Sequence, residues 1–259
     1  MSIALVPTMG ALHRGHTSLI EIAARAADAT VVSIFVNPKQ FGPNEDLISY
    51  PRDLNRDLET LKMSQARLVF APTPADMYPD GFATSVKVEG LTQELCGKVR
   101  PHFFEGVTTV VAKLLLQAMP DVAVFGEKDY QQLLVIRRMV RDLDIPVEIL
   151  SGPVVREPDG LALSSRNAYL SETERPIAAM LNRRLTEGAQ KIAAGEDIRI
   201  REEAGTKTRP QDGFSSVDYV EVRDADSLDR LSSLRLPSRL LAAARIGQTR
   251  LIDNVPIGG

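Results

Sequence analysis

The sequence contains little of what disulfide-bonded, membrane-spanning or exported proteins need. It has one cysteine, Cys96, so no disulfide can form within the chain and an oxidising compartment is not implied. No apolar run reaches the roughly 18–20 residues that cross a bilayer. The first residues also lack the basic and apolar regions of a signal peptide. These absences predict a soluble, cytoplasmic protein with no membrane partner.

The excess of one charge over the other is also small. The 31 Lys and Arg residues against 34 Asp and Glu residues give a net charge of −3, with a pI near 5.7. This balance provides no electrostatic footprint for nucleic acid. The composition, 44% hydrophobic and 25% charged, is that of a globular protein and excludes an intrinsically disordered chain. A length of 259 residues accommodates one large domain or two unequal ones.

Short apolar runs alternate with amphipathic segments over roughly the first 150 residues. Strands are expected near 3–6, 31–36, 67–70, 122–125 and 147–150, and helices near 16–27, 53–63, 107–119 and 130–143. This βαβ alternation predicts an α/β domain over residues 1–154, with a Rossmann-like doubly wound parallel sheet. Such sheets bind ligands beyond the carboxyl ends of their strands, so the informative loops follow Val6, Val36 and Phe125.

The pattern changes after residue 153, where residues 155–259 predict a smaller, lid-like C-terminal α+β domain. Ser171 to Glu174 fit a capping box that opens a long helix. Residues 195–215 are polar and predict a surface segment. Strands are expected at 219–222, 239–244 and 250–253.

Two of the three histidines lie in the segment Pro-Thr-Met-Gly-Ala-Leu-His-Arg-Gly-His, residues 7–16, between the first strand and the first helix. Gly10 and Gly15 allow backbone N–H groups to approach a ligand. A helix N-terminus favours a phosphate, to which His13 and His16 can donate. A histidine considered alone is more often an ordinary surface residue, but this pair flanking a glycine favours a phosphate site.

The His-x-Gly-His pattern at this position resembles the nucleotidyltransferase superfamily, and the longer string resembles its pantoate–β-alanine ligase family. Further segments in the expected order carry the same resemblance along the whole chain. These are Phe-Val-Asn-Pro-Lys-Gln-Phe at 35–41, Phe-Gly-Glu-Lys-Asp-Tyr-Gln-Gln at 125–132, Asp-Gly-Leu-Ala-Leu-Ser-Ser-Arg-Asn at 159–167, and Ala-Arg-Ile-Gly at 244–247 with Arg-Leu-Ile-Asp-Asn at 250–254.

The resemblance implies an enzyme that condenses (R)-pantoate with β-alanine, using ATP and Mg²⁺ and passing through a pantoyl adenylate. It also implies a homodimer. A plain adenylyltransferase would share the first and third motifs but form no amide. A class I aminoacyl-tRNA synthetase would need a tRNA-binding region, for which neither length nor charge leaves an obvious candidate. A non-enzymatic nucleotide-binding module is the remaining alternative.

The resemblance also assigns residues. His16, as the candidate proton donor, and His13, Lys128 and Arg166 are the expected catalytic residues. Gln40 and Gln132 are expected to bind pantoate, with Gln40 near β-alanine. The ATP-binding residues are expected to be Met9, Gly10, His13, Gly15, His16, Gly126, Lys128, Asp129, Val155, Leu163, Ser164, Ser165 and Arg166. No cluster of histidine, cysteine and carboxylate residues has metal-ligand spacing, so no protein metal site is predicted.

Each of these assignments has a structural alternative. Without the resemblance, the sequence favours Gln40 as a polar turn residue over Gln40 as a ligand contact. Asp129 and Gln132 have the spacing of a capping box, in which the Gln132 side chain would turn toward its own backbone. The triplet of Ser164, Ser165 and Arg166 resembles many solvated loops, and its assignment to ATP depends on its position in the chain.

The sequence departs from the family pattern in two places. The family has a lead segment of roughly twenty residues before the first strand, where element boundaries are only approximate. This chain begins almost at that strand, and the expected effect is on stability rather than chemistry. The family string Arg-Pro-Gly-His-Phe reads Arg-Pro-His-Phe-Phe at 100–104, so His102 is displaced by one position and receives no catalytic role.

Overall fold

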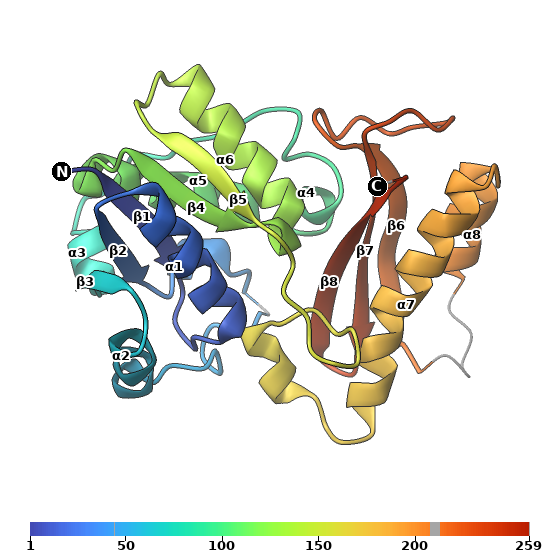
Figure 1. Cartoon of the computed structure of the whole chain (residues 1–259), viewed down its shortest axis with the longest axis horizontal. Coiled ribbons are helices and arrows are strands. Elements are labelled where there is room, and N and C mark those ends of the chain that lie inside the picture. The colour runs from blue at the N-terminus through green and yellow to red at the C-terminus, as the bar shows by residue number, and fades with distance from the viewer. Residues whose placement is uncertain (44, 208–212, 259) are drawn as a thin grey trace. The chain divides into compact units, whose positions relative to one another are not determined.

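The computed structural model describes residues 1–43, 45–207 and 213–258, which form two compact units (Figure 1). The first unit consists of Met1–Glu127 and Gln131–Val155. The second consists of Lys128–Tyr130 and Arg156–Gly259. Most of the predicted phosphate-binding and substrate-binding loops belong to the first unit, and the remainder to the second.

The first unit contains a five-stranded parallel sheet in the order β3-β2-β1-β4-β5. Its strands are β1 (Ile3–Thr8), β2 (Ala29–Ile34), β3 (Ala66–Phe70), β4 (Val122–Gly126) and β5 (Glu148–Gly152). Its longer helices are α1 (Arg14–Ala26), α2 (Leu54–Lys62), α5 (Phe103–Ala118) and α6 (Tyr130–Asp142). This arrangement confirms the predicted doubly wound parallel sheet.

Burial explains why these segments form their elements. The central strand β1 is apolar and buried over Ala4, Leu5 and Val6, as expected for a parallel strand covered on both faces. Helix α1 is amphipathic and buries Leu19 and Ile20 against β1 and β4. Helix α5 is buried along most of its length and is therefore apolar around nearly its whole circumference.

Most predicted elements of the first unit form, with ends displaced by a few residues. The largest displacement is at α5, expected from residue 107 and observed from Phe103. Two one-turn helices, α3 (Pro74–Met77) and α4 (Cys96–Val99), lie where no element was expected. Such short helices lack a readable period, and local capping decides them: Thr73 and Asp76 form a reciprocal capping box at α3.

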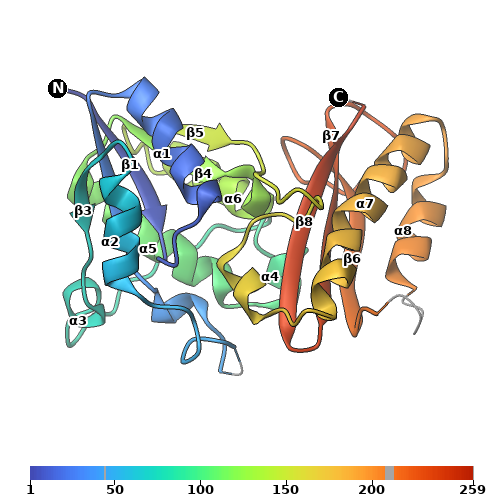
Figure 2. The same cartoon turned by 60° about the horizontal axis from the view of Figure 1, so that its bottom comes forward.

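The second unit is an antiparallel sheet in the order β6-β7-β8, packed by two helices (Figure 2). The strands are β6 (Ser216–Asp224), β7 (Ser238–Ile246) and β8 (Thr249–Ile257), and the helices are α7 (Glu174–Ala193) and α8 (Ile198–Thr206). Helix α7 packs on β7 and β8, whereas α8 packs on β6. Ala178, Leu185, Leu240 and Ile246 are among the residues of their common core.

Two expectations for the second unit need correction, and one is confirmed. The three strands extend beyond the predicted ranges at both ends, because antiparallel pairing continues through their polar residues. The segment 195–215, expected as polar surface, contains helix α8, which buries Ile198 and Glu202; residues 208–212 lie outside the described range. The reciprocal bonds of the capping box form, with Glu174 N donating to Ser171 Oγ and Ser171 N donating to Glu174 Oε2. The N-cap residue of α7 is nevertheless Thr173, which makes no side-chain capping bond.

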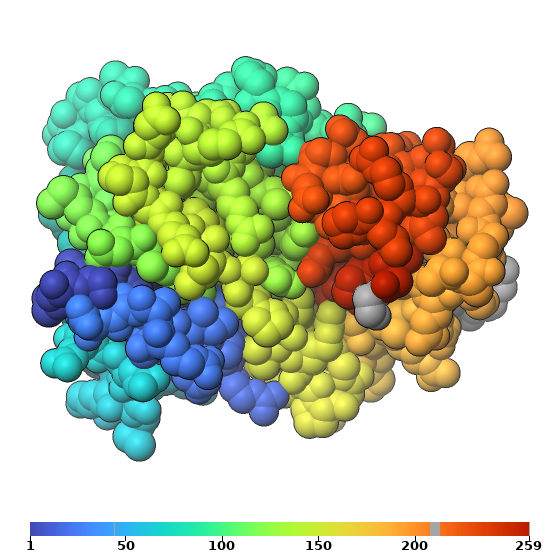
Figure 3. Space-filling view, turned by 45° about the horizontal axis from the view of Figure 1, so that its top comes forward, coloured from blue at the N-terminus to red at the C-terminus, as the bar shows by residue number. Residues whose placement is uncertain are grey.

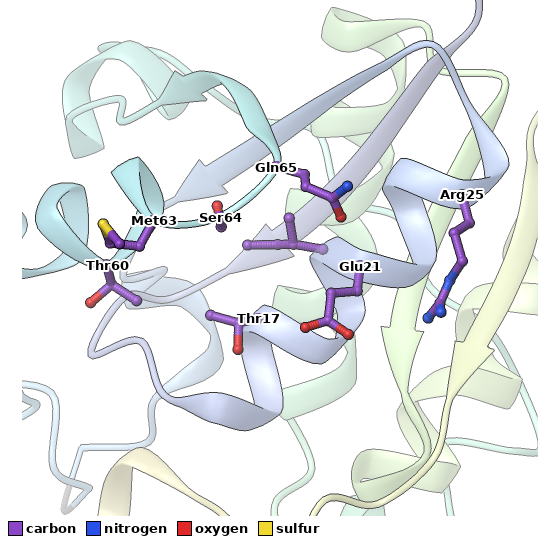
Figure 4. A pocket seen from close by; sticks show the side chains of 8 residues that line it. Thr17, Glu21, Arg25, Thr60, Met63, Ser64 and Gln65 are labelled. Carbon is purple, nitrogen blue, oxygen red and sulfur yellow. The ribbon is translucent and has the colours of Figure 1, made fainter.

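A pocket of about 630 Å³ opens in the first unit between α1 and the end of α2. The surfaces of these two helices, blue and cyan, lie side by side in Figure 3. Figure 4 shows that charged, polar and apolar side chains line this pocket. The lining residues are Thr17, Ile20, Glu21, Arg25, Thr60, Met63, Ser64 and Gln65, none of which is a predicted site residue. Of the helices in the described ranges, none has the length and apolar character required to span a membrane.

Candidate active site

The two predicted ATP motifs of the parallel sheet begin at neighbouring strands. Strands β1 and β4 pair in parallel, with Ala4 opposite Val122, so their carboxyl ends lie at the same edge of the sheet. From β1 the chain continues to β2 on one side, and from β4 to β5 on the other. This reversal is the topological switch point, where open α/β sheets bind ligands.

The two histidines at the end of β1 cap helix α1 reciprocally. Gly15 N donates to Nδ1 of His13 over 3.1 Å, and His13 N donates to Nδ1 of His16 over 3.2 Å. The ring centroids lie 4.0 Å apart. Because both Nδ1 atoms accept hydrogen bonds, each neutral ring carries its hydrogen on Nε2. The loop therefore provides two Nε2–H groups, and such groups can donate to phosphate oxygens.

The backbone N–H groups of the same loop are bonded within the protein. Ala11 N and Leu12 N donate to the Asp57 carboxylate over 2.9 and 2.7 Å, and His16 N donates to His13 O. Gly10, with φ of 80°, faces the same carboxylate: a Cβ there would lie 2.8 Å from Asp57 Oδ2. A glycine at position 10 is thus required by the turn and by Asp57. In this structure the imidazole side chains, more than a cradle of N–H groups, are suited to meet a ligand.

Gln40 lies against the histidine loop. It ends the short 3₁₀ helix Pro38–Gln40 that follows β2. The buried Asn37 donates through Nδ2 to Gln40 Oε1 over 3.1 Å and to Gly106 O over 3.0 Å. Gln40 Nε2 donates to Met9 Sδ over 2.9 Å. The structure therefore brings together Gln40 and Met9, which were predicted from separate motifs.

Two residues that support this loop were not singled out by the sequence reasoning. Tyr78 donates through its hydroxyl to Asn37 Oδ1 over 2.7 Å, and burial raises the pKa of Tyr78 to about 12, so it remains a donor at neutral pH. Arg100 donates to Gln40 O over 3.1 Å, forms an ion pair with Glu45 and stacks on Phe103.

The family string at 100–104 therefore contributes its arginine to the Gln40 loop. His102, the displaced histidine, lies at the start of α5 and makes no side-chain capping bond. The only sequence signal for Arg100 was its place in that string, since its contact with Gln40 joins residues 60 positions apart.

The two glutamines at the start of α6 differ in their surroundings. Gln131 is buried, accepts from Cys96 N and donates to Leu91 O and Glu94 O, so it fixes the loop of residues 91–96. Gln132 is half-buried, and its side chain makes no hydrogen bond with any residue of the described ranges. The alternative in which Gln132 closes a capping box with Asp129 is not seen.

In the second unit, Lys128 lies next to a residue of the predicted C-terminal motif. Asn254, on β8, donates through Nδ2 to Lys128 O over 3.1 Å. Arg239, on β7, donates to Asn254 Oδ1 and stacks on the ring of Tyr130, whose hydroxyl donates to Ala225 O over 2.8 Å. Lys128 Nζ is 3.7 Å from Asp129 Oδ2. The backbone of the lysine turn is thus fixed by the C-terminal sheet.

The Ser-Ser-Arg triplet lies at the start of the 3₁₀ helix Ser165–Tyr169 in the second unit. Ser164 Oγ accepts from Arg166 N over 3.3 Å, so this serine caps the turn. Leu163, Ser164, Ser165 and Arg166 are all half-buried rather than fully solvated. Val155, also predicted, is half-buried at the end of the first unit, and Gly126 ends β4.

No group of three or more histidine, cysteine or carboxylate side chains within the described ranges is arranged to hold a metal ion. The chemistry present is that of hydrogen-bond donors at a topological switch point. A doubly wound sheet with a His-x-Gly-His turn after its first strand and a lysine turn after the neighbouring strand defines a nucleotide-dependent α/β enzyme of the His-x-Gly-His class.

The chain belongs to the pantoate–β-alanine ligase family, whose model matches residues 1–256. It is 57% identical to the pantothenate synthetase of Sphingopyxis alaskensis over 262 residues, which cover 99% of this chain and 92% of that protein. The pantothenate synthetase of Paramagnetospirillum magneticum is 56% identical, with 99% and 90% covered.

Solved structures of the same family have the same fold. A crystal structure of pantothenate synthetase from Thermus thermophilus superposes with a TM-score of 0.93 at 49% identity, covering 98% of this chain and 93% of that one. The ligase from Francisella tularensis, crystallised with an ATP compound and β-alanine, gives a TM-score of 0.82 at 37% identity, with 98% and 89% covered.

Proposed function

We propose that this chain catalyses the ATP-dependent condensation of (R)-pantoate with β-alanine to give pantothenate. The observation that carries the proposal is family membership over nearly the whole chain, joined to the assembly of His13, His16, Met9 and Gln40 at the switch point. The related ligase crystallised with an ATP compound and β-alanine supports the two co-substrates.

The reaction proceeds in two steps. A pantoate carboxylate oxygen attacks the α-phosphorus of MgATP, and the bond to the β,γ-diphosphate breaks, releasing pyrophosphate and leaving pantoyl adenylate. The β-alanine amine then attacks the acyl carbon, AMP leaves, and the amine loses a proton as the amide forms. Mg²⁺ enters as part of the nucleotide substrate, bound by phosphate oxygens and water. The protein supplies positioning and stabilisation of phosphate charge.

We assign the phosphate contacts to side chains that donate hydrogen bonds. Nε2–H of His16 stabilises the charge that develops on the phosphates in the first step, and Nε2–H of His13 assists it. Lys128 and Arg166 supply positive charge. The remaining nucleotide contacts are proposed for Met9, Gly10, Gly15, Gly126, Asp129, Val155, Leu163, Ser164 and Ser165.

We assign pantoate to Gln40 and Gln132, with β-alanine also near Gln40. Asn37 donates to Gln40 Oε1, whereas Gln40 Nε2 donates, among the described residues, only to the thioether of Met9. A thioether is a weak acceptor, so a substrate carboxylate or hydroxyl displaces it readily. Gln132, whose amide has no hydrogen-bond partner within the described ranges, can offer both a donor and an acceptor.

The deciding experiment is product analysis with the purified protein, (R)-pantoate, β-alanine and MgATP. We expect pantothenate, AMP and pyrophosphate in equal amounts. A plain adenylyltransferase would release pyrophosphate and accumulate the adenylate with no amide, and a nucleotide-binding module would bind ATP without turnover. Either result would contradict the proposal. Omission of Mg²⁺ in the presence of a chelator should abolish both steps.

The pantoate assignment is tested by Gln132→Leu, which removes hydrogen-bonding atoms at similar volume. Because adenylation precedes amide formation, pantoate-dependent exchange of labelled pyrophosphate into ATP should be lost without β-alanine, while ATP binding persists. The melting temperature should remain near that of the wild type, because this amide makes no hydrogen bond within the described ranges. Normal exchange in the variant would remove Gln132 from the pantoate site.

We further propose that the enzyme works as a homodimer in the cytoplasm, which the family resemblance supports. The mass in solution by light scattering tests the assembly, and fractionation of cells tests the location. A monomeric species with full activity would contradict the first, and recovery of the protein outside the cytoplasm would contradict the second.

A further inference from the structure

Asp57 is a buried carboxylate that the reaction described above does not use. It lies in the first turn of α2, and only 3% of its surface is exposed. Its two oxygens accept from successive backbone N–H groups, Oδ2 from Ala11 and Oδ1 from Leu12. The N-terminal end of α2 and these two N–H groups provide the favourable electrostatics for its charge.

The backbone that Asp57 holds is unfavourable in isolation. Gly10 and Ala11 both adopt positive φ, 80° and 50°, and only Leu12 separates them from the first histidine. A side chain in this left-handed region is strained and persists only where surrounding contacts enforce it. The carboxylate supplies two such contacts, one on Ala11 itself and one on the residue after it.

The turn determines where the histidines lie. His13 follows Leu12 directly, and His13 N donates to Nδ1 of His16. A displacement of the turn therefore shifts the donor that orients His16 and the ring that accepts from Gly15 N. The two hydrogen bonds of the Asp57 carboxylate are to backbone N–H groups, so its influence on the rings passes through the backbone.

We propose that Asp57 is the positioning residue of the histidine loop: its carboxylate holds the left-handed turn at Gly10 and Ala11 and thereby sets the placement of His13 and His16 for adenylation. This inference rests on the proposed function for its kinetic arm only. Asp57 is absent from the motifs that carry the family resemblance, and 46 residues separate it from Ala11.

The test variant is Asp57→Asn, which keeps the shape but turns one acceptor into a donor facing a backbone N–H. The matched control is Asp53→Asn on the same helix: Asp53 caps α2 by accepting from Arg56 N, and asparagine caps equally well. We expect Asp57→Asn to lower the pantoate-dependent exchange rate by about 10- to 100-fold, the scale of a small misplacement of reacting groups. Asp53→Asn should remain within about twofold of the wild type.

A second readout does not require activity. In ¹⁵N-labelled protein, the ring nitrogens of His13 and His16 should show the Nε2–H form in the wild type and in Asp53→Asn, and an altered or averaged signature in Asp57→Asn. A merely structural role would lower the melting temperature yet leave the exchange rate well below melting, and the ring signature, unchanged. That combination would overturn the proposal.

A variant at the turn itself covers the case in which Asp57→Asn fails to fold. Ala11→Val places a β-branched side chain at positive φ while leaving Asp57 intact, so we expect the same loss of exchange and the same change in the ring signature. An unchanged rate and signature in Ala11→Val would overturn the proposal. If the wild type forms no pantothenate, the proposed function fails, while the ring signature still decides the role of Asp57.

Discussion

In the first unit, the buried side chains of Asn37 and Asp57 hold loops that lie beyond the strand ends, whereas in the second unit the buried Glu202 holds a strand. Glu202, on α8, accepts from Val222 N of β6 over 2.9 Å and from Arg230 over 2.6 Å. The central strands of the parallel sheet satisfy one another's backbone hydrogen bonds. Buried polar side chains near the ends of these strands are therefore available to hold the loops. The small sheet must instead cover its edge strand.

This difference separates activity from stability. Replacing a polar residue in the loops of the first unit should reduce turnover more than stability. Replacing a buried polar residue of the second unit, away from the lysine turn, should reduce stability more than turnover. The three predictions below test this separation, beginning with the largest effect.

His16→Ala should lower turnover by about 10²-fold or more while the fold persists, because it removes the donor that we assign to the transition state. Steady-state rates and the melting temperature, measured on one preparation, provide the comparison. His102→Ala is the matched control, since this histidine makes no capping bond at α5. A folded His16→Ala enzyme with near-normal turnover would remove His16 from the mechanism.

Glu202→Leu should lower the free energy of unfolding by about 1–3 kcal/mol, because Val222 N and Arg230 lose their buried acceptor. Turnover per folded molecule should change by less than about twofold. Chemical denaturation measures the first quantity. The adjacent Glu203, 71% exposed and paired with Lys207, is the control: Glu203→Leu should cost no more than about 0.5 kcal/mol. Equal costs at the two positions would refute the edge-strand role.

The smallest effect concerns Asp224 at the end of β6. The Ser227 N–H, aided by the Arg235 guanidinium and the Asp226 N–H, lowers the pKa of Asp224 from 3.8 to about 2. Because the folded state favours the ionised carboxylate, this stabilisation is complete above pH 4 and is lost as the pH falls toward 2. The melting temperature of Asp224→Asn should therefore lie below the wild type at pH 6 and approach it near pH 2. A gap independent of pH would refute this assignment.

The sequence could predict elements that depend on local pattern. The buried run Ala4 to Val6 and the amphipathic helix α1 have clear periods, and the histidine pair lies within eight residues of the end of β1. Residues such as Asp57 and Asn254 could not be predicted in this way. Their partners lie 46 and 126 positions away, and only the paired strands and packed helices bring them into contact. The short helix α4 likewise has too few residues to show a period.

The reciprocal cap of His13 and His16 also limits the charge that the proposed phosphate-binding loop can carry. A protonated imidazole bears hydrogen on both nitrogens, so neither ring can become a cation and still accept the N–H bond that begins α1. Protonation of either ring at acidic pH would therefore break a hydrogen bond at the start of α1, and the first turn of this helix should fray. While both Nδ1 atoms accept these bonds, the phosphate contacts proposed for the pair are those of neutral donors. In the proposed reaction, the compensating charge for the triphosphate then comes from the metal ion that accompanies ATP and from Lys128 and Arg166.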